Sequence, residues 1–303
     1  MTHLLAFSTR RARRAVGALL ALASGASLAV AVPPTPPQEL TIAVGGDVMF
    51  GRVTSSGWRP HGGTDPFGTW GQTLANADVA FVNLETGICS QGRTHSRLPL
   101  LWAPPDRLRA LTKVGVDVVS VANNHALDCG PDGVTQTRAA LDALGIAAAG
   151  IAPTGSVRVS RNVVVFAATL HPPPYRARGA RPVVALGSDL PPRIAHLRRQ
   201  YPARLLVASL HWGRERASEP AAWQRDLARQ LIAAGAQLIA GHGPHTPQPR
   251  EQIGDGIVLY SVGNFVFDDQ SPVGRPRAPA ILRFRRTQDG WVYVPELAPR
   301  VGR

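Results

Sequence analysis

The chain has 303 residues, of which 44% are hydrophobic and 17% are charged, and its net charge is +13. This size and composition suit one large α/β domain, and the absence of a long internal repeat argues against a solenoid. The basic residues are scattered and not interleaved with aromatic side chains, which argues against a nucleic-acid-binding platform. Nearly all of them are arginine, which indicates either a coding bias or attraction to an acidic polymer, headgroup or phosphate.

The N-terminal segment has the features of an export signal. Four arginines between Arg10 and Arg14 precede an apolar run, Ala15–Val32, and Ala29–Ala31 has the small residues of a signal-peptidase site. We expect a signal peptide over residues 1–31, whose removal takes away four arginines and leaves a net charge of +9. The protein would then be periplasmic or extracellular, and it would be exported by the Sec or the twin-arginine route. An uncleaved membrane anchor is the alternative.

A proline-rich linker over residues 32–39 precedes one domain over residues 40–303. In that domain, apolar runs alternate with helical patterns. Strands are expected at Leu40–Gly45, Ala77–Leu84, Val114–Ala122, Val159–Thr169, Leu205–Leu210, Ala236–Ala240 and Ile257–Ser261. Helices are expected at Asp106–Lys113, Asp132–Leu144, Pro191–Gln200 and Glu219–Ala234. A closing hairpin is expected at Ala280–Arg285 and Gly290–Val294, an extended segment at Leu100–Pro105, and a loop at His171–Leu190. The alternation predicts an α/β fold.

Five of the expected strands are followed by a loop with acidic, amide or imidazole side chains. These loops carry Asp47, Glu85, Asn124 with His125, His211, and His242 with His245. Because α/β sheets bind ligands beyond the carboxyl ends of their strands, we expect the loops to converge on one rim and form one site. Imidazole and carboxylate ligands without thiolate suit Zn, Mn or Fe. His125 is alternatively a general acid, and the guanidinium of Arg52 suits an anionic group.

Six motifs resemble the CapA capsule-synthesis family, which is linked to poly-gamma-glutamate synthesis and export. They are GDVMFGR at Gly46–Arg52, NLE at Asn83–Glu85, ANNHALDCG at Ala122–Gly130, HWGRE at His211–Glu215, GHGPHTPQP at Gly241–Pro249 and YSVGNFVFD at Tyr260–Asp268. The family is similar to the calcineurin-like metallophosphoesterases. This resemblance implies a four-layer α/β/β/α sandwich.

The resemblance also implies a role for each site residue. Asp47 and His245 match ligands of a first metal, and Glu85 stands where a carboxylate bridges two metals. Ligands of a second metal are matched by Asn124, His211 and His242, and the adjacent catalytic histidine by His125. Met49 stands where a histidine ligand is usual and Gly243 where many CapA proteins have histidine, so the expected number of divalent ions is one or two. We expect Glu215 to assist catalysis, Arg52 to act in catalysis or substrate binding, and Asn264 to contact substrate.

The two cysteines, Cys89 and Cys129, follow two of the site loops. If those loops are neighbours, a disulfide is plausible in an exported protein, and two buried free thiols are the alternative.

Three functions remain open from the sequence. The first is a metal-dependent hydrolase or transferase that acts on an anionic polymer such as poly-gamma-glutamate. The resemblance also implies membrane-bound capsule-synthesis subunits as partners. The second is a non-catalytic polymer-binding or export factor on the same fold. The third is a phosphoesterase of small phosphorylated substrates.

Overall fold

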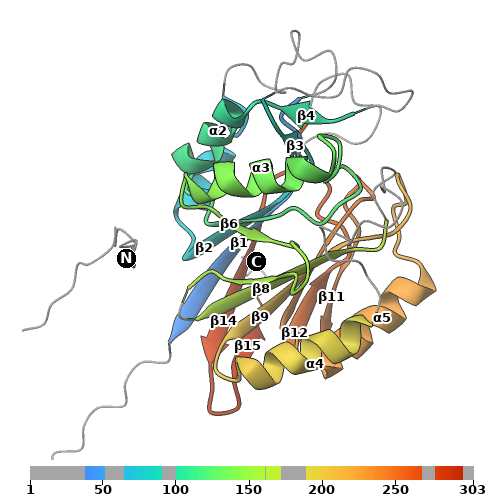
Figure 1. The fold of residues 1–303 in the computed structure, drawn as a ribbon. Coiled ribbons are helices and arrows are strands. Elements are labelled where there is room, and N and C mark those ends of the chain that lie inside the picture. Colours follow the sequence, from blue (N-terminus) through green and yellow to red (C-terminus); the bar gives the residue numbers. More distant parts are fainter. Residues whose placement is uncertain are drawn as a thin grey trace, which may run out of the picture. The chain divides into compact units, whose positions relative to one another are not determined.

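The computed structural model describes residues 38–51, 65–90, 100–160, 162–171, 189–267 and 277–295. The expected signal peptide, most of the linker, Arg52 and most of the loop His171–Leu190 lie outside these residues. Within them, no helix is long and apolar enough to span a bilayer. The fold is drawn in Figure 1.

One sheet is built mainly from the first half of the described chain. Its strands are β1 (Glu39–Val48), β2 (Val79–Leu84), β5 (Val118–Ser120), β6 (Ala147–Ala149), β13 (Asn264–Val266), β14 (Ala280–Arg286) and β15 (Trp291–Val294). The order is β15-β14-β1-β2-β5-β6, and β13 pairs with the end of β1. The four strands β1, β2, β5 and β6 are parallel, so their carboxyl ends lie at one edge. The closing hairpin of β14 and β15 is antiparallel, as expected.

A second sheet comes from the later part of the chain. Its strands are β7 (Ser156–Arg158), β8 (Val163–Thr169), β9 (Leu205–His211), β10 (Leu238–His242), β11 (Arg250–Ile253) and β12 (Gly256–Leu259). The order is β11-β12-β10-β9-β8-β7, with β8, β9, β10 and β12 parallel. A separate two-stranded ladder joins β3 (Gly87–Ile88) and β4 (Trp102–Ala103).

Helices cover the outer faces of the two sheets. They are α1 (Trp70–Ala75), α2 (Arg109–Lys113) after a 3₁₀ turn (Pro105–Leu108), α3 (Pro131–Asp142), α4 (Leu190–Gln200) and α5 (Ala222–Ala233). Leu74, Leu111 and Leu141 pack α1, α2 and α3 on the first sheet. Ile194 of α4 and Leu231 of α5 pack on the second. The helices α3 and α4 lie on opposite sides of the pair of sheets (Figure 1).

The strand β8 shows why the two sheets pack face to face between the helix layers. Val163, Val165 and Ala167 face the core between the sheets, while Val164 and Phe166 face α4 and α5. Successive side chains of a strand point to opposite faces, so an unbroken apolar run is buried on both sides. The expected four-layer α/β/β/α sandwich is confirmed.

The sequence predicted that the site residues lie along the rim of one sheet, and the structure corrects this prediction. The strand ends that carry the site residues belong to two sheets, because β1, β2 and β5 lie in the first and β9 and β10 in the second. The site is therefore formed where two edges meet, and not along one.

The two cysteines form a disulfide, Cys89–Cys129. It joins the segment after β3 to the turn before α3, and thus the loop after Glu85 to the loop after His125. The alternative of two free thiols is excluded.

Candidate metal centre

Asp47 lies near the end of β1 and is fully buried. The preceding residue, Gly46, allows the approach of a third segment, since a Cβ at Gly46 would lie 1.8 Å from the carbonyl oxygen of Gly263. The amide of Asp47 donates to that same oxygen at 2.9 Å. This close packing places Asp47 beside Asn83 of β2 and Asn264 of β13 in the strand register.

The second sheet supplies three histidines. His211 and His242 end β9 and β10 and are paired in register. The chain then turns sharply, with φ of 106° at Gly243 and 59° at His245. A positive φ is unusual for a residue with a side chain and is often found at functional sites. The turn directs His245 back toward the first sheet.

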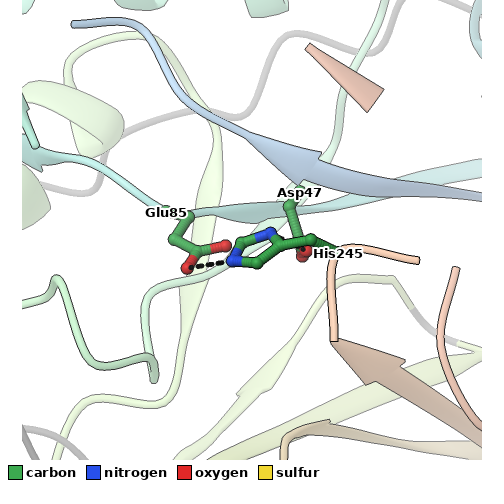
Figure 2. A group of neighbouring side chains, drawn as sticks. All are labelled: Asp47, Glu85 and His245. Carbon is green, nitrogen blue, oxygen red and sulfur yellow. Dashed lines mark ion pairs between the residues drawn. The ribbon is translucent and has the colours of Figure 1, made fainter. Parts of the chain in front are cut away.

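Asp47, Glu85 and His245 form a compact buried cluster (Figure 2). One ligand atom of each lies within 4.8 Å of the others. Nδ1 of His245 is 3.2 Å from Oδ2 of Asp47, and its Nε2 is 3.7 Å from Oε1 of Glu85. Two carboxylates and one imidazole at this separation are a donor set that suits a divalent metal.

The other two histidines lie around the same cluster. Nδ1 of His242 is 3.0 Å from Oδ1 of Asp47, and Nε2 of His211 is 3.8 Å from Oε1 of Glu85. Several buried polar atoms of the site residues have no hydrogen-bond partner in the described part of the chain: Asp47 Oδ2, Glu85 Oε1, Asn124 Oδ1, His211 Nδ1 and His242 Nε2. Buried polar atoms are normally paired. A bound cation would satisfy the unpaired oxygens of Asp47 and Glu85, so these residues fit a metal.

The electrostatics of the metal-free cluster show how closely these groups interact. Burial alone would raise the pKa of Asp47, but the close contacts with His242 and His245 and their charges outweigh it and hold the pKa far below its usual range. Burial raises the pKa of Glu85 to about 7. Burial would lower the pKa of His245, yet the charge of Glu85 and the contact with Asp47 raise it to about 10. Burial lowers the pKa of His211 well below 6.5.

Two buried amides hold the carboxylates in place, and the sequence had not indicated their role. Nδ2 of Asn83 donates to Asp47 at 2.9 Å and to Oε2 of Glu85 at 3.5 Å. Nδ2 of Asn123 donates to Oδ1 of Asn83 and to the carbonyl of Leu84, at 3.2 and 2.9 Å. Oδ1 of Asn123 accepts from the amide of His125 at 3.1 Å. A single network thus links three strand-end loops.

His125 lies at the mouth of the cluster, with 18% of its side chain exposed. Its Nδ1 is 2.7 Å from Oδ2 of Asp128, and its Nε2 is 4.0 Å from Oε1 of Glu85. Asp128 is buried and also accepts from the amide of Leu101 at 2.6 Å. Because a carboxylate accepts, Nδ1 carries a proton and Nε2 faces the cluster. Like Asn83 and Asn123, Asp128 has a role in the site that the sequence had not indicated.

The remaining expected residues lie as follows. Asn264 is fully buried, and its Oδ1 is 2.9 Å from Nδ1 of His245. Glu215 is exposed in the loop after β9, and its charge adds to burial in raising the pKa of Glu85. Asn124 is half-buried beside His125. Arg52 lies outside the described residues.

The two departures from the family pattern have clear surroundings. Met49 is fully buried in an apolar cluster with Leu101 and Phe267, so this position supplies no nitrogen ligand. At Gly243, an added Cβ would lie 3.2 Å from Nε2 of His211 and 3.0 Å from the carbonyl of Trp212. The backbone there also has φ of 106°, so a larger residue would be strained.

The fold and the site together define an α/β/β/α sandwich protein with a candidate metal centre between its two sheets. The chain belongs to the family described as bacterial capsule synthesis protein PGA_cap, whose model matches residues 41–269. The resemblance to CapA proteins is thereby confirmed.

Relatives with curated names agree with this family. The chain is 31% identical to a probable polyglutamine synthesis accessory protein of Mycobacterium tuberculosis, over 78% of this chain and 77% of that protein. It is 28% identical to the capsule biosynthesis protein CapA of Bacillus anthracis, over 76% of this chain and 60% of that protein. It is also 28% identical to the PGA biosynthesis protein CapA of Bacillus subtilis, over 81% of this chain and 67% of that protein.

A solved structure with a similar fold is the crystal structure of a hypothetical protein from Thermus thermophilus. The TM-score is 0.50 at 15% identity, and the match covers 84% of this chain and 96% of that chain. This likeness concerns the fold alone.

Proposed function

We propose that this protein is an exported capsule-synthesis protein with a metal-dependent hydrolase or transfer site that acts on an anionic polymer such as poly-gamma-glutamate. The observation that carries the proposal is the buried cluster of Asp47, Glu85 and His245, with site atoms that lack hydrogen-bond partners. The names of the relatives support the polymer, and the net charge of +9 expected after removal of the signal peptide is compatible with it.

Asp47, Glu85 and His245 would hold a divalent metal such as Zn, Mn or Fe, with His211, His242 and Asn124 as further ligands. When bound, the metal would polarise an oxygen of the substrate and lower the pKa of a water molecule. The amides Asn83 and Asn123 keep the two carboxylates in position for it. Asn264 orients His245 through its contact with Nδ1, which suits a positioning role better than substrate contact.

When both of its ring nitrogens carry a proton, His125 would give the proton on Nε2 to the leaving group, and Asp128 would keep the ring in orientation through Nδ1. The partial exposure of His125 leaves room for substrate beside it. Glu215 is exposed in the loop after β9, where it would be available to a polymer that arrives from solvent.

A non-catalytic polymer-binding or export factor is the second candidate, and one observation favours it. Met49 replaces a possible imidazole ligand with an apolar side chain packed against Leu101 and Phe267. A site with fewer ligands binds metal more weakly and holds fewer ions. A phosphoesterase of small substrates is the third candidate, and no observation favours it over the first.

Turnover distinguishes these candidates. The purified protein, loaded in turn with Zn, Mn and Fe, is incubated with poly-gamma-glutamate and with a small phosphoester. An increase in the number of polymer chain ends that requires metal, and that does not occur with the His125→Ala variant, would support the polymer-directed enzyme. Binding of the polymer with no turnover under any metal would favour the binding factor. Phosphate release that the polymer does not inhibit would favour the phosphoesterase.

A further inference from the structure

Arg216 has an unusual backbone conformation in the loop after β9. Its φ is 62°, and among the described residues only Asp189 and the site residue His245 share a positive φ without being glycine. A left-handed conformation is unfavourable for a residue with a Cβ, and such positions gather at functional sites. Glycine would adopt this backbone conformation at a lower cost in free energy. The presence of arginine therefore indicates a function for its side chain.

Hydrogen bonds fix this loop to the metal-site loop. The amide of Arg216 donates to the carbonyl of Pro244, which stands between His242 and His245, at 2.9 Å. The next residue, Ala217, accepts from Nε2 of Gln248 at 2.9 Å. Arg216 is therefore held at the rim of the cluster.

The side chain of Arg216 is exposed and has no acidic partner among the described residues. Among the other exposed arginines, Arg138 pairs with Asp142 and Arg229 with Asp226, whereas Arg199 and Arg214 also have no acidic partner among the described residues. A planar guanidinium matches a carboxylate with two parallel hydrogen bonds.

We propose that Arg216 is a substrate-binding residue that holds a carboxylate of an anionic chain whose reacting bond lies at the metal cluster. This inference rests on the proposed function and deepens it, because it names a residue that selects a polyanion. The hydrogen bond from its amide to Pro244 couples the backbone position of Arg216 to that of His245.

Two variants at this position separate the side chain from the backbone. Arg216→Gly removes the guanidinium and relieves the backbone, while Arg216→Ala removes the guanidinium and keeps the strain. Arg199→Ala is the matched control, because Arg199 is an exposed arginine on α4 and its loss changes the net charge equally. The probe is a fluorescently labelled oligomer of γ-linked glutamate, and binding to the full chain is followed by fluorescence anisotropy.

We expect both Arg216 variants to bind the oligomer about tenfold more weakly, and Arg199→Ala to bind like the wild type. We also expect Arg216→Gly to raise the melting temperature by about 2–4 °C relative to Arg216→Ala. An oligomer whose carboxylates are methyl esters should bind weakly and equally to all four proteins.

Three results would overturn the inference. If the Arg216 variants bind like Arg199→Ala while the wild type binds well, the proposed function stands and only the role of Arg216 fails. If Arg216→Gly loses both affinity and melting temperature, the residue is structural. If the wild type does not bind the oligomer, the role of Arg216 and the polymer-directed function fail together.

Discussion

Nδ1 of His242 lies 3.0 Å from Oδ1 of Asp47, although 195 residues separate them in the chain. Asp47 lies near the end of β1 in the first sheet and His242 at the end of β10 in the second. This contact joins the carboxyl edges of the two sheets. The proposed metal centre thus also cross-links the halves of the sandwich, so metal binding and stability should be coupled.

The hydrogen-bond network of Asn83 and Asn123 should be needed for the stability of the protein and for metal binding at the site. Asn123→Ala removes two donated hydrogen bonds and leaves Oδ1 of Asn83, the carbonyl of Leu84 and the amide of His125 without this partner. We expect unfolding by urea to show a loss of about 2–3 kcal/mol, together with weaker metal binding. Asn76→Ala, at an exposed position, is the control and should change stability by less than about 0.5 kcal/mol. Equal losses of stability in the two variants would contradict a stabilising role of the amide network.

The contributions of Glu85 and His245 to the stability of the metal-free protein should fall as pH rises. The pKa of Glu85 is raised from 4.5 to about 7, so the native state binds this proton more tightly than the unfolded chain. Its contribution is fully present below pH 4.5 and is lost as pH rises through about 7. The contribution of His245 is likewise present below 6.5 and lost as pH rises through about 10.

Glu85→Gln should remove the lower part of this dependence, on the order of 2–3 kcal/mol. Urea unfolding of chelator-treated proteins across this range measures it. Metal should stabilise the wild type more at higher pH, because ligands release protons on binding. A metal-free wild type and Glu85→Gln variant with the same pH dependence would contradict the assigned environment of Glu85.

His125 and Asp128 should act on turnover and not on metal binding, if the site is catalytic. His125→Ala should lower the metal-dependent rate by about 10²–10⁴-fold. Asp128→Asn should lower it by about 10–100-fold, because the ring of His125 loses its carboxylate partner. Both variants should retain the metal content of the wild type. Loss of metal in Asp128→Asn would indicate that Asp128 supports the ligands instead.

The disulfide should stabilise the two loops that it joins. It closes a loop with a sequence separation of 40, for which the chain-entropy model gives about 3–4 kcal/mol. The double variant Cys89→Ala/Cys129→Ala should lose about this much in urea unfolding. Reductant should lower the stability of the wild type similarly and leave the double variant unchanged. A double variant as stable as the wild type would show that the loops are held by packing alone.

Much of the fold could be predicted because each central strand is an apolar run of strand length with a turn at its end. The short edge elements could not. Ala147–Ala149 carries only alanines, and Arg250–Ile253 is partly exposed and polar, so neither pattern distinguishes a strand from a loop. The division into two sheets followed only from the resemblance, because periodicity does not show which strands pair.

The loops of the site could be predicted, but its supporting residues could not. Asn83 and Asn123 become important through the strand register, which shifts between Val44 and Asp47 of β1 and aligns Asp47 with Asn83. Asp128 becomes important because the turn after Asn124 brings it under the ring of His125. Such contacts depend on three-dimensional placement, which residue spacing alone does not determine.

The most direct test is the metal content of the purified protein, measured by elemental analysis beside the His242→Ala variant. We expect about one or two divalent transition-metal ions per chain in the wild type and a clear loss in the variant. A wild type that stays empty after incubation with Zn, Mn and Fe would contradict the metal centre and leave polymer binding as the better explanation of the fold.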